Sequence, residues 1–289
     1  MEESDYELVA LDLDGTVLDS SKRVGSAFKE AVARLAAGGV RTVVCTGRRW
    51  RSTLPVFDEI ESAHPVVISC GGALVKEAGT HRVLRADPLP MDVARETVLV
   101  FRRAGLVPFV LYDRPSTERE LLVSELDRER LLRVAYFERN ADSFDYYPGE
   151  WWECEAPPLV VYTVDHASLA YAARDRAREV LGDRALVTAL AHTLYGPDQV
   201  ALEIHSPTAT KWSALSWLLE RLQIPAERVI AIGDDVNDVP MLRGAGLSFA
   251  MANAQPEVKA VADRVTTGSN DEDGVLHALR SVFPILAGL

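Results

Sequence analysis

The sequence predicts a two-domain α/β protein with a parallel-sheet core and a second domain inserted into it. Three observations support this prediction. Short apolar runs of strand length alternate with stretches of helical periodicity near both ends of the chain. Polar residues follow directly after several of these runs. Between about residues 84 and 206 the pattern changes, and prolines such as Pro108 and Pro157 interrupt it.

The first segment reads as strand, helix, strand, helix, strand. Its apolar, β-rich runs occupy residues 8–11, 40–45 and 66–69. Between the first two runs, apolar side chains recur at helical spacing from Ala27 to Leu35. Runs that can be buried on both faces and that alternate with helices predict a parallel sheet with helices on both sides.

The same alternation resumes near the C-terminal end. Thr208 is the expected N-cap of a helix that carries Leu215 and Leu219 and that Pro225 closes. Residues 229–232 form another apolar run, and shorter strands are expected at 247–251 and around Val265. We therefore expect the core domain to comprise residues 1–84 and 207–289.

Residues 85–206 are expected to form an inserted α+β domain. Strand-like runs occur at 107–112 and 159–164, and a helical stretch lies between Ala167 and Leu181.

Composition excludes some classes of function. The formal net charge is −12 and the pI about 5.0. Binding to duplex nucleic acid needs a basic face, so a nucleic-acid partner is disfavoured.

No signal-like N-terminus and no run of about 18 apolar residues is present. The three cysteines lack C-x-x-C spacing. We expect a cytoplasmic monomer or small homo-oligomer with free thiols and no membrane partner.

Carboxylates lie where the predicted strands end. Four polar residues lie at the C-terminal ends of apolar runs: Asp12, Asp14, Thr46 and Asp234. The carboxyl ends of parallel strands share one edge of a sheet, so these side chains should converge. Asp12 and Asp14 leave the same face of an extended chain and repel each other, which a cation would relieve. Oxygen-only ligands at a phosphate site favour Mg²⁺.

These residue types suit phosphoryl transfer. A carboxylate can attack phosphorus to form an aspartyl-phosphate, and a second can protonate the leaving alcohol, which typically contributes about 10²–10⁴-fold. Thr46 and Gly47 offer a hydroxyl and a backbone N–H to a phosphate oxygen. Lys211 is one of only five lysines and offers a compact positive charge in the first turn of a helix.

The sequence resembles the haloacid dehalogenase superfamily in four ordered motifs. They are Asp12-Leu13-Asp14-Gly15-Thr16, Thr46-Gly47-Arg48, Lys211 and Gly233-Asp234-Asp235-Val236-Asn237-Asp238. The place of the insert, between the second and third motifs, is similar to that of the type IIB (Cof-like) branch. Four further stretches extend the resemblance: residues 250–254, 258–259, 262–263 and 270–275. A Rossmann-like core with a type IIB cap is the fold that the resemblance implies.

The resemblance also implies roles in catalysis and metal binding. Asp12 would be the nucleophile and a Mg²⁺ ligand. Asp14 would be the general acid and base, and a ligand through its backbone carbonyl. Asp234 would be the second carboxylate ligand, Asp238 a catalytic acid behind the ligands, and Lys211 a catalytic cation. Because dehalogenases and ATP pumps of this superfamily lack a carboxylate at position 14, phosphatase or phosphomutase chemistry is expected.

The phosphate would be bound by Thr46, Gly47 and Lys211, with Asn237 beside it. Arg48 is left with two interpretations, a substrate contact or a salt bridge at the sheet edge. Cof-like proteins usually have Asn where this chain has Gly71, so the substrate preference is expected to differ.

Several other residues have a plainer interpretation beside a functional one. Asp235 is expected to be structural and Cys45 to be a packed thiol. Arg114 is a candidate for contact with a polar leaving group. An aromatic group could form the cap's own core or a surface loop, or line a pocket over a sugar; it comprises Phe144, Tyr146, Tyr147, Trp151 and Trp152.

The predicted reaction is Mg²⁺-dependent hydrolysis of small-molecule phosphate monoesters through phospho-Asp12, with the cap closing over the intermediate. Sugar phosphates are the leading substrates, ahead of nucleotides and pyridoxal phosphate. A phosphomutase of the same superfamily and a non-catalytic phosphate-binding switch remain as alternatives.

Overall fold

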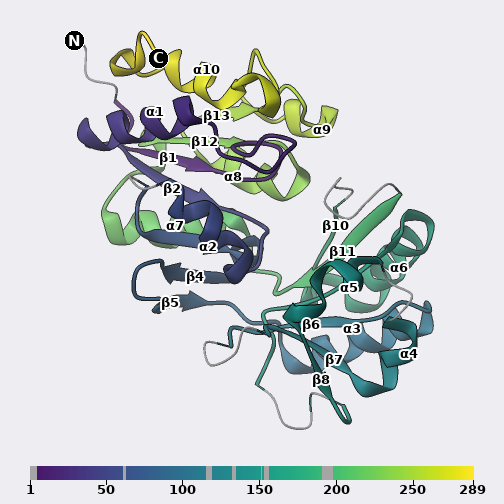
Figure 1. The fold of residues 1–289 in the computed structure, drawn as a ribbon. Coiled ribbons are helices and arrows are strands. Elements are labelled where there is room, and N and C mark those ends of the chain that lie inside the picture. Colours follow the sequence, from purple (N-terminus) through teal and green to yellow (C-terminus); the bar gives the residue numbers. More distant parts are fainter. Residues whose placement is uncertain are drawn as a thin grey trace. The chain divides into compact units, whose positions relative to one another are not determined.

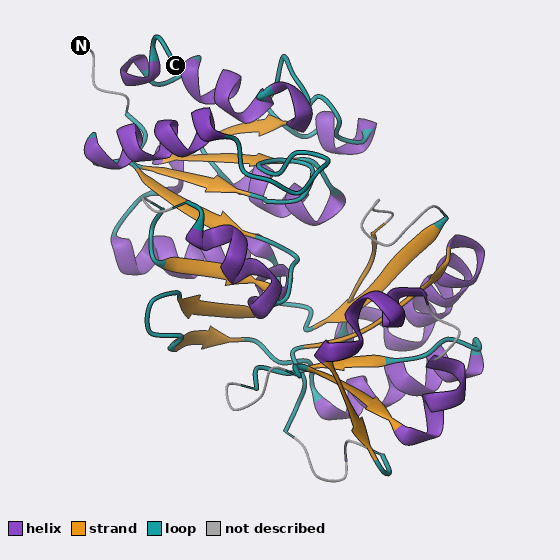
Figure 2. Cartoon of the chain, in the orientation of Figure 1, coloured by secondary structure: helices purple, strands orange, loops and turns teal. Residues whose placement is uncertain are grey.

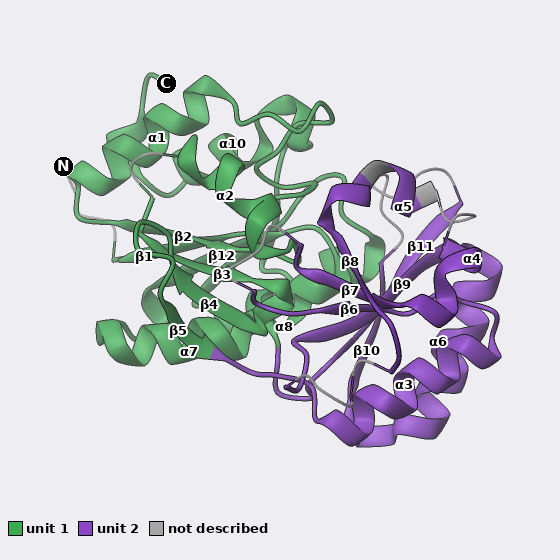
Figure 3. Ribbon diagram, turned by 60° about the horizontal axis from the view of Figure 1, so that its bottom comes forward, with its two compact units in different colours: residues 1–85, 210–289 green, residues 86–209 purple. Residues whose placement is uncertain are grey.

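The computed structural model describes residues 5–60, 63–114, 119–131, 135–150, 152, 156–190 and 198–289. The chain divides into two compact units, one of residues 1–85 and 210–289 and the other of residues 86–209 (Figure 3). The second unit is thus inserted into the chain of the first. The divisions expected from the sequence lie after residues 84 and 206.

The first unit is built on an eight-stranded sheet in the order β14-β13-β12-β1-β2-β3-β4-β5, as counted over the described residues (Figure 1). Its strands are β1 Leu8–Leu11, β2 Arg41–Cys45, β3 Val66–Ser69, β4 Leu74–Glu77, β5 Val83–Ala86, β12 Val229–Gly233, β13 Leu247–Ala250 and β14 Arg264–Val265. Neighbouring strands are parallel from β14 to β3, as predicted, whereas β4 runs antiparallel to β3.

Helices cover both faces of this sheet. They are α1 Ser26–Ala37, α2 Trp50–Asp58, α7 Lys211–Leu222, α8 Val239–Gly244, α9 Pro256–Lys259 and α10 Gly274–Arg280. Helices α1 and α10 lie on one face, and α7 and α8 lie on the other (Figures 1 and 3). Helix α1 packs through Phe28, Ala31, Val32 and Leu35, which share the predicted helical spacing. The predicted α/β class is confirmed.

Helix α7 begins two residues later than expected. Thr210, not Thr208, is its N-cap: the Thr210 hydroxyl accepts a hydrogen bond from the Ser213 backbone N–H at 3.0 Å, and the Thr210 N–H donates to Ser213 Oγ at 3.2 Å. This reciprocal box satisfies two N–H groups that a helix start leaves unpaired. The Thr208 hydroxyl instead donates to Asp87 Oδ2. Lys211 is therefore the first residue of the helix.

The second unit has its own sheet, in the order β10-β11-β9-β6-β7-β8 (Figure 2). Its strands are β6 Phe109–Leu111, β7 Leu121–Ser124, β8 Phe144–Tyr147, β9 Val160–His166, β10 Leu186–Leu190 and β11 Gln199–His205. Helices α3 Met91–Arg103 and α6 Ala167–Leu181 pack on one face and bury the unit's apolar core. The shorter helices are α4 Arg128–Leu131 and α5 Ala135–Asn140.

None of the helices in the described part of the chain is both long and apolar enough to cross a bilayer.

Candidate active site

The candidate site lies where the strand order of the first unit changes direction. Strands β1 and β12 are parallel neighbours near the middle of the sheet, with Leu11 opposite Ile232. Asp12 follows β1, and its N–H donates to the Ile232 carbonyl at 3.1 Å. Asp234 follows β12 at the same edge. From β1 the chain proceeds to β2 on one side, while β12 proceeds to β13 on the other. In open α/β sheets, ligands bind outside the carboxyl ends of the strands at such a reversal.

A buried lysine joins two carboxylates at this edge of the sheet. Lys211 Nζ donates to Asp12 Oδ1 and to Asp238 Oδ1, each at 2.6 Å, and its side chain is only 1% exposed. The second oxygen of Asp238 accepts the N–H groups of Asp234 and Asp235 at 3.0 and 3.1 Å. Asp238 therefore fixes both the ammonium and the turn that carries Asp234.

Gly15 allows Asp234 to approach the turn after β1. Its φ is +77°, and a Cβ built on it would lie 2.2 Å from Asp234 Oδ2. A larger residue would therefore be strained and would also displace the carboxylate. The next residue, Thr16, donates its hydroxyl to Asp234 Oδ1 at 2.8 Å. The predicted first motif and the predicted fourth motif thus meet through direct contacts.

Three carboxylates of the site form a group that could hold a metal ion. Asp12, Asp234 and Asp238 each offer an oxygen, and the three atoms lie within 4.8 Å of one another. Burial raises the pKa of Asp12 to about 7. The positive charge of Lys211 lowers this pKa, and the negative charges of Asp238 and Asp14 raise it further. Burial, followed by the charges of Asp12 and Asp238, also raises the pKa of Asp234. Because all the donors are carboxylate oxygens, and the pKa values of Asp12 and Asp234 are raised, the group fits a hard divalent cation.

Asp14 lies in a separate ion pair within the site. Arg48 Nε donates to Asp14 Oδ2 at 2.5 Å and Arg48 Nη2 donates to Asp14 Oδ1 at 2.7 Å, a bidentate arrangement. Lys22 Nζ lies 3.1 Å from the same Oδ1. Burial favours the neutral acid, but the Arg48 and Lys22 contacts outweigh it and lower the pKa of Asp14. Of the two interpretations of Arg48, this structure shows an ion pair, and its partner is a residue of the site.

Lys22 was not among the residues predicted for the site. It lies in a loop whose position no strand or helix periodicity indicates, and its φ of +62° is rare for a residue other than glycine. The one available signal was the scarcity of lysine in this chain, which also pointed to Lys211.

The residues expected to bind phosphate follow strand β2. The Thr46 N–H donates to the Ile68 carbonyl at 2.8 Å, and Thr46 Oγ1 accepts the Arg48 N–H at 3.1 Å, which leaves the hydroxyl proton for another acceptor. A Cβ on Gly47 would lie 3.3 Å from Asn237 Nδ2, so the Asn237 amide lies beside Gly47. Asn237 Oδ1 is buried and has no hydrogen-bond partner among the described residues. A polar ligand could satisfy it.

Three neighbouring residues have structural roles here. Asp235 Oδ1 accepts the Val236 N–H at 2.6 Å and so caps the short turn that follows β12. Cys45 is buried, and burial raises its pKa, so it is held as a neutral thiol. Gly71 has φ 64° and ψ 13°, the left-handed region, which asparagine also tolerates better than most residues. The conformation thus accommodates either residue at this position.

The other predicted residues lie in the second unit. Phe144 is buried and contacts Phe109 and Phe137 ring to ring at 5.1 and 5.3 Å. Tyr147 and Trp152 pack against the unit's apolar core. The ring of Tyr146 lies under the Arg128 guanidinium, and Arg114 pairs with Asp145 at 3.0 Å. Trp151 and Cys154 lie outside the described residues.

Comparison with known proteins places this geometry in context. Residues 9–279 match the model of the family described as haloacid dehalogenase-like hydrolase. The chain is 28% identical to the phosphatase YwpJ of Bacillus subtilis, over 96% of this chain and 100% of that protein. It is 27% identical to the 5-amino-6-(5-phospho-D-ribitylamino)uracil phosphatase YitU of the same organism, over 99% and 100%. A haloacid dehalogenase-like hydrolase from Bacteroides thetaiotaomicron has a crystal structure similar to this one, with a TM-score of 0.76, 26% identity and coverage of 96% and 100%.

Proposed function

The chain belongs to the haloacid dehalogenase-like hydrolases, and we propose that it is a Mg²⁺-dependent phosphatase that uses the Asp12 carboxylate as its nucleophile. Its substrates in this proposal are small-molecule phosphate monoesters. The observation that carries the proposal is the contact of Lys211 with Asp12 inside a group of three carboxylates, of which Asp12 and Asp238 are buried. Such a group supplies a nucleophile, a fixed positive charge and a metal site within one small region.

In this proposal, Asp12, Asp234 and the backbone carbonyl of Asp14 hold Mg²⁺. The raised pKa values of Asp12 and Asp234 support it, because a cation favours the ionised form of both. When bound, Mg²⁺ would offset the negative charge that the carboxylates and the phosphoryl oxygens bring together. Asp238 holds Lys211 and the turn after β12 in place and need not touch the substrate.

In the first step, a carboxylate oxygen of Asp12 attacks phosphorus and the bond between phosphorus and the ester oxygen breaks. The leaving oxygen takes a proton from Asp14 and departs as the alcohol, and the phosphoryl group remains on Asp12. The Thr46 hydroxyl, the Gly47 N–H and the Lys211 ammonium donate to the phosphoryl oxygens. Binding by groups that are already fixed lowers the reorganisation needed in the transition state.

In the second step, water attacks the phosphorus of phospho-Asp12, and Asp14 accepts the water's proton. Inorganic phosphate leaves and Asp12 is regenerated. To accept this proton, Asp14 must start the second step as a carboxylate, and its lowered pKa favours that ionised form. For the first step, we propose that Arg48 exchanges Asp14 for a phosphate oxygen, because loss of its bidentate contact would let Asp14 hold a proton.

For the substrate we propose phosphorylated sugars and sugar alcohols first, with nucleotides and pyridoxal phosphate behind them. The name of YitU, a relative along its whole length, specifies a phosphate on a ribityl chain, which supports this order. We assign the choice of leaving group to the second unit, which the resemblance identifies as a type IIB cap. This assignment concerns specificity and leaves the chemistry in the first unit.

Release of inorganic phosphate from a panel of phosphate monoesters, with and without Mg²⁺, tests the proposal. We expect release from several sugar phosphates in Mg²⁺ and none after chelation. Transfer of phosphate to a second position of the substrate, without release, would indicate a phosphomutase. A protein that binds Mg²⁺ and phosphate but turns over no ester would indicate the non-catalytic switch.

A further inference from the structure

The loop between β1 and α1 supports two carboxylates of the site. Thr16 Oγ1 donates to Asp234 Oδ1 at 2.8 Å, and Lys22 Nζ donates to Asp14 Oδ1 at 3.1 Å. The two contacts leave the loop at different points, so its conformation as a whole sets where both carboxylates are held. Whatever fixes this loop therefore also fixes the site.

An asparagine from the segment after β13 holds the start of the loop. Asn253 Nδ2 donates to the Gly15 carbonyl at 2.8 Å, and Asn253 Oδ1 accepts the Asn270 N–H at 3.1 Å. Both ends of the amide are engaged, which defines its orientation. Asn270 Nδ2 in turn donates to the Leu18 carbonyl at 2.8 Å. The loop is thus held at two backbone carbonyls.

An aspartate holds the far side of the loop. Asp271 accepts the Ser20 N–H on Oδ1 at 2.7 Å and the Ser20 hydroxyl on Oδ2 at 2.6 Å. Hydrogen bonds to a charged acceptor are stronger than those between neutral groups. Ser20 precedes Lys22 by two residues, and the Lys22 N–H closes the turn on the Asp19 carbonyl at 2.8 Å. Asp271 therefore fixes the turn from which Lys22 reaches Asp14.

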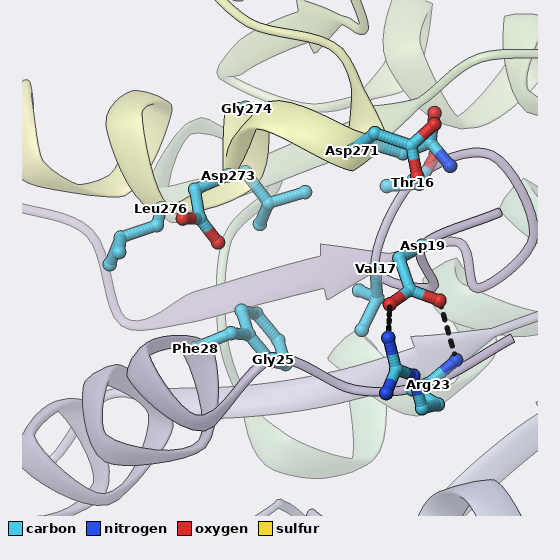
Figure 4. Close-up of a pocket in the computed structure, with 12 residues that line it drawn as sticks. Thr16, Val17, Asp19, Arg23, Gly25, Phe28, Asp271, Asp273, Gly274 and Leu276 are labelled. Atoms are coloured by element: carbon cyan, nitrogen blue, oxygen red, sulfur yellow. Dashed lines mark hydrogen bonds and ion pairs between the residues drawn. The ribbon is translucent and has the colours of Figure 1, made fainter. Parts of the chain in front are cut away.

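Packing holds only part of this loop: Val17 and Leu18 are buried, but one side of the loop borders a gap. A cavity of about 120 Å³ lies between the loop and the segment that contains α10. Figure 4 shows Val17 and Asp19 on one wall and Asp273 and Leu276 on the other. A loop that borders a cavity lacks van der Waals partners on that side, so its conformation there depends more on its hydrogen bonds.

We propose that Asn253, Asn270 and Asp271 are positioning residues for the site, and that they act through the loop of residues 15–24. The stretches 250–254 and 270–275 belong to the family resemblance, but the sequence alone assigns them no role. Here they belong to one clamp, formed by segments that lie more than 200 residues after the loop they hold. The catalytic part of this inference rests on the proposed phosphatase function, whereas the part that concerns metal binding does not.

Three variants test the clamp. Asn253→Asp is nearly isosteric and keeps the acceptor for Asn270, but it removes the donor to Gly15. Asp271→Ala removes both contacts to Ser20. Asp271→Asn keeps an acceptor for the Ser20 N–H and offers an N–H to the Ser20 hydroxyl, so it is the conservative rescue. Glu257→Ala, an exposed acid in the first turn of α9, is the matched control for loss of a surface charge.

The readouts are Mg²⁺ affinity by calorimetry, kcat and KM for p-nitrophenyl phosphate, and the thermal midpoint. Groups that orient metal ligands typically contribute about 10–100-fold to affinity or activity. We expect Asn253→Asp and Asp271→Ala to weaken Mg²⁺ binding and to lower kcat within that range, with KM nearly unchanged. Asp271→Asn should recover most of both values, and Glu257→Ala should match the wild type.

Several outcomes would overturn the inference. Unchanged Mg²⁺ affinity and kcat in both disruptive variants would show that the site needs no clamp. Losses in Asp271→Ala that Asp271→Asn does not recover would assign them to charge instead of hydrogen bonding. A wild type that binds no Mg²⁺ would remove the basis of the clamp. A wild type that binds Mg²⁺ but hydrolyses no ester would overturn the proposed function alone, and the clamp would be judged on affinity.

Discussion

The ammonium of Lys211 lies 2.6 Å from Oδ1 of Asp12, although 199 residues separate them in the chain. Both side chains are buried, so each loses its hydration and relies on the other, and on Asp238, to offset that cost. Replacing such a pair by apolar residues is often neutral for stability, whereas removing one member is not. The contact is therefore better explained by the chemistry of the site than by stability.

Truncation of this lysine should destabilise the protein. Lys211→Ala leaves Asp12 and Asp238 buried without their cation, and breaking a buried pair in this way typically costs about 3–5 kcal/mol. At acidic pH the two carboxylates would take up protons, which would keep the loss of stability near the lower end of this range. Urea denaturation at pH 7.5 in EDTA measures the change. Lys29→Ala, which removes an exposed pair with Glu59, should cost less than about 1 kcal/mol, and equal losses would contradict the argument.

Removal of the proposed nucleophile should abolish turnover. Asp12→Asn keeps the shape of the side chain and an oxygen for Lys211, but the amide is a poor nucleophile. Loss of a nucleophile can cost about 10⁶-fold in kcat, and we expect phosphate release to fall below detection. Asp235→Asn is the control from the fourth motif, because asparagine also caps a turn and activity should persist. Substantial turnover by Asp12→Asn would exclude the aspartyl-phosphate mechanism.

Asp12→Asn should also alter the pH dependence of stability when no metal is bound. The pKa of Asp12 is about 7 in the folded protein, against 3.8 as its ordinary value. The folded state thus binds more protons between these values, so this contribution to stability is present at low pH and is lost as pH rises toward 7. The expected slope is at most about 1.4 kcal/mol per pH unit.

Urea titrations of the wild type and Asp12→Asn in EDTA, from pH 5 to 8, check the sign. The wild type should lose stability relative to the variant as pH rises, and Mg²⁺ should flatten the difference. Asp14→Asn should show no such slope from pH 5 to 8, because the lowered pKa of Asp14 contributes stability that is lost only as pH falls below the ordinary value of 3.8. A difference that grows in favour of the wild type toward pH 8 would contradict the assignment for Asp12.

Sequence patterns predicted the core well because each pattern has a direct physical cause. The run at residues 8–11 is β1, and strand ends brought Asp12, Thr46 and Asp234 to one edge as expected. The N-cap of α7 was misassigned because both Thr208 and Thr210 are good caps. The choice between them depends on the contact of Thr208 with Asp87, which is distant in sequence.

Other features of the site depend on loop conformation and could not be predicted. The pairing of Arg48 and Lys22 with Asp14 requires a turn with Lys22 at positive φ, and no periodicity encodes that turn. The contacts of Asn253 and Asp271 were hidden for the same reason. The motifs containing them could be identified, but their role could not.

Chelation should inactivate the protein reversibly and also lower its stability. Mg²⁺ at about 100 times its dissociation constant should stabilise the folded state by about 2.7 kcal/mol, because the ion binds the folded site and not the unfolded chain. Thermal melts with EDTA and with Mg²⁺ measure the shift. Asp234→Asn removes a proposed ligand and should abolish most of it. A shift of the same size in that variant would place the ion elsewhere.

Gly72 should be far less tolerant of substitution than another glycine of similar conformation. Gly72 lies between β3 and β4 in the chain and against the start of α7 in space. Its φ is +105°, and a Cβ there would lie 2.1 Å from the Thr210 carbonyl oxygen and 2.9 Å from the Lys211 nitrogen. Gly72→Ala would therefore push away the N-cap that places Lys211. Gly39 has φ +83° with nothing within 4 Å of its Cβ position, so Gly39→Ala carries only the backbone cost of about 1–2 kcal/mol.

Overpacking adds about 1–3 kcal/mol or more to that backbone cost, so Gly72→Ala should be the less stable of the two in urea denaturation. It should also lower kcat in a folded sample, because the shift reaches Lys211, whereas Gly39→Ala should leave kcat unchanged. Equal effects of the two substitutions would mean that the start of α7 can move without displacing the ammonium from Asp12. In that case, the contacts of Lys211 with Asp12 and Asp238 would suffice to position it.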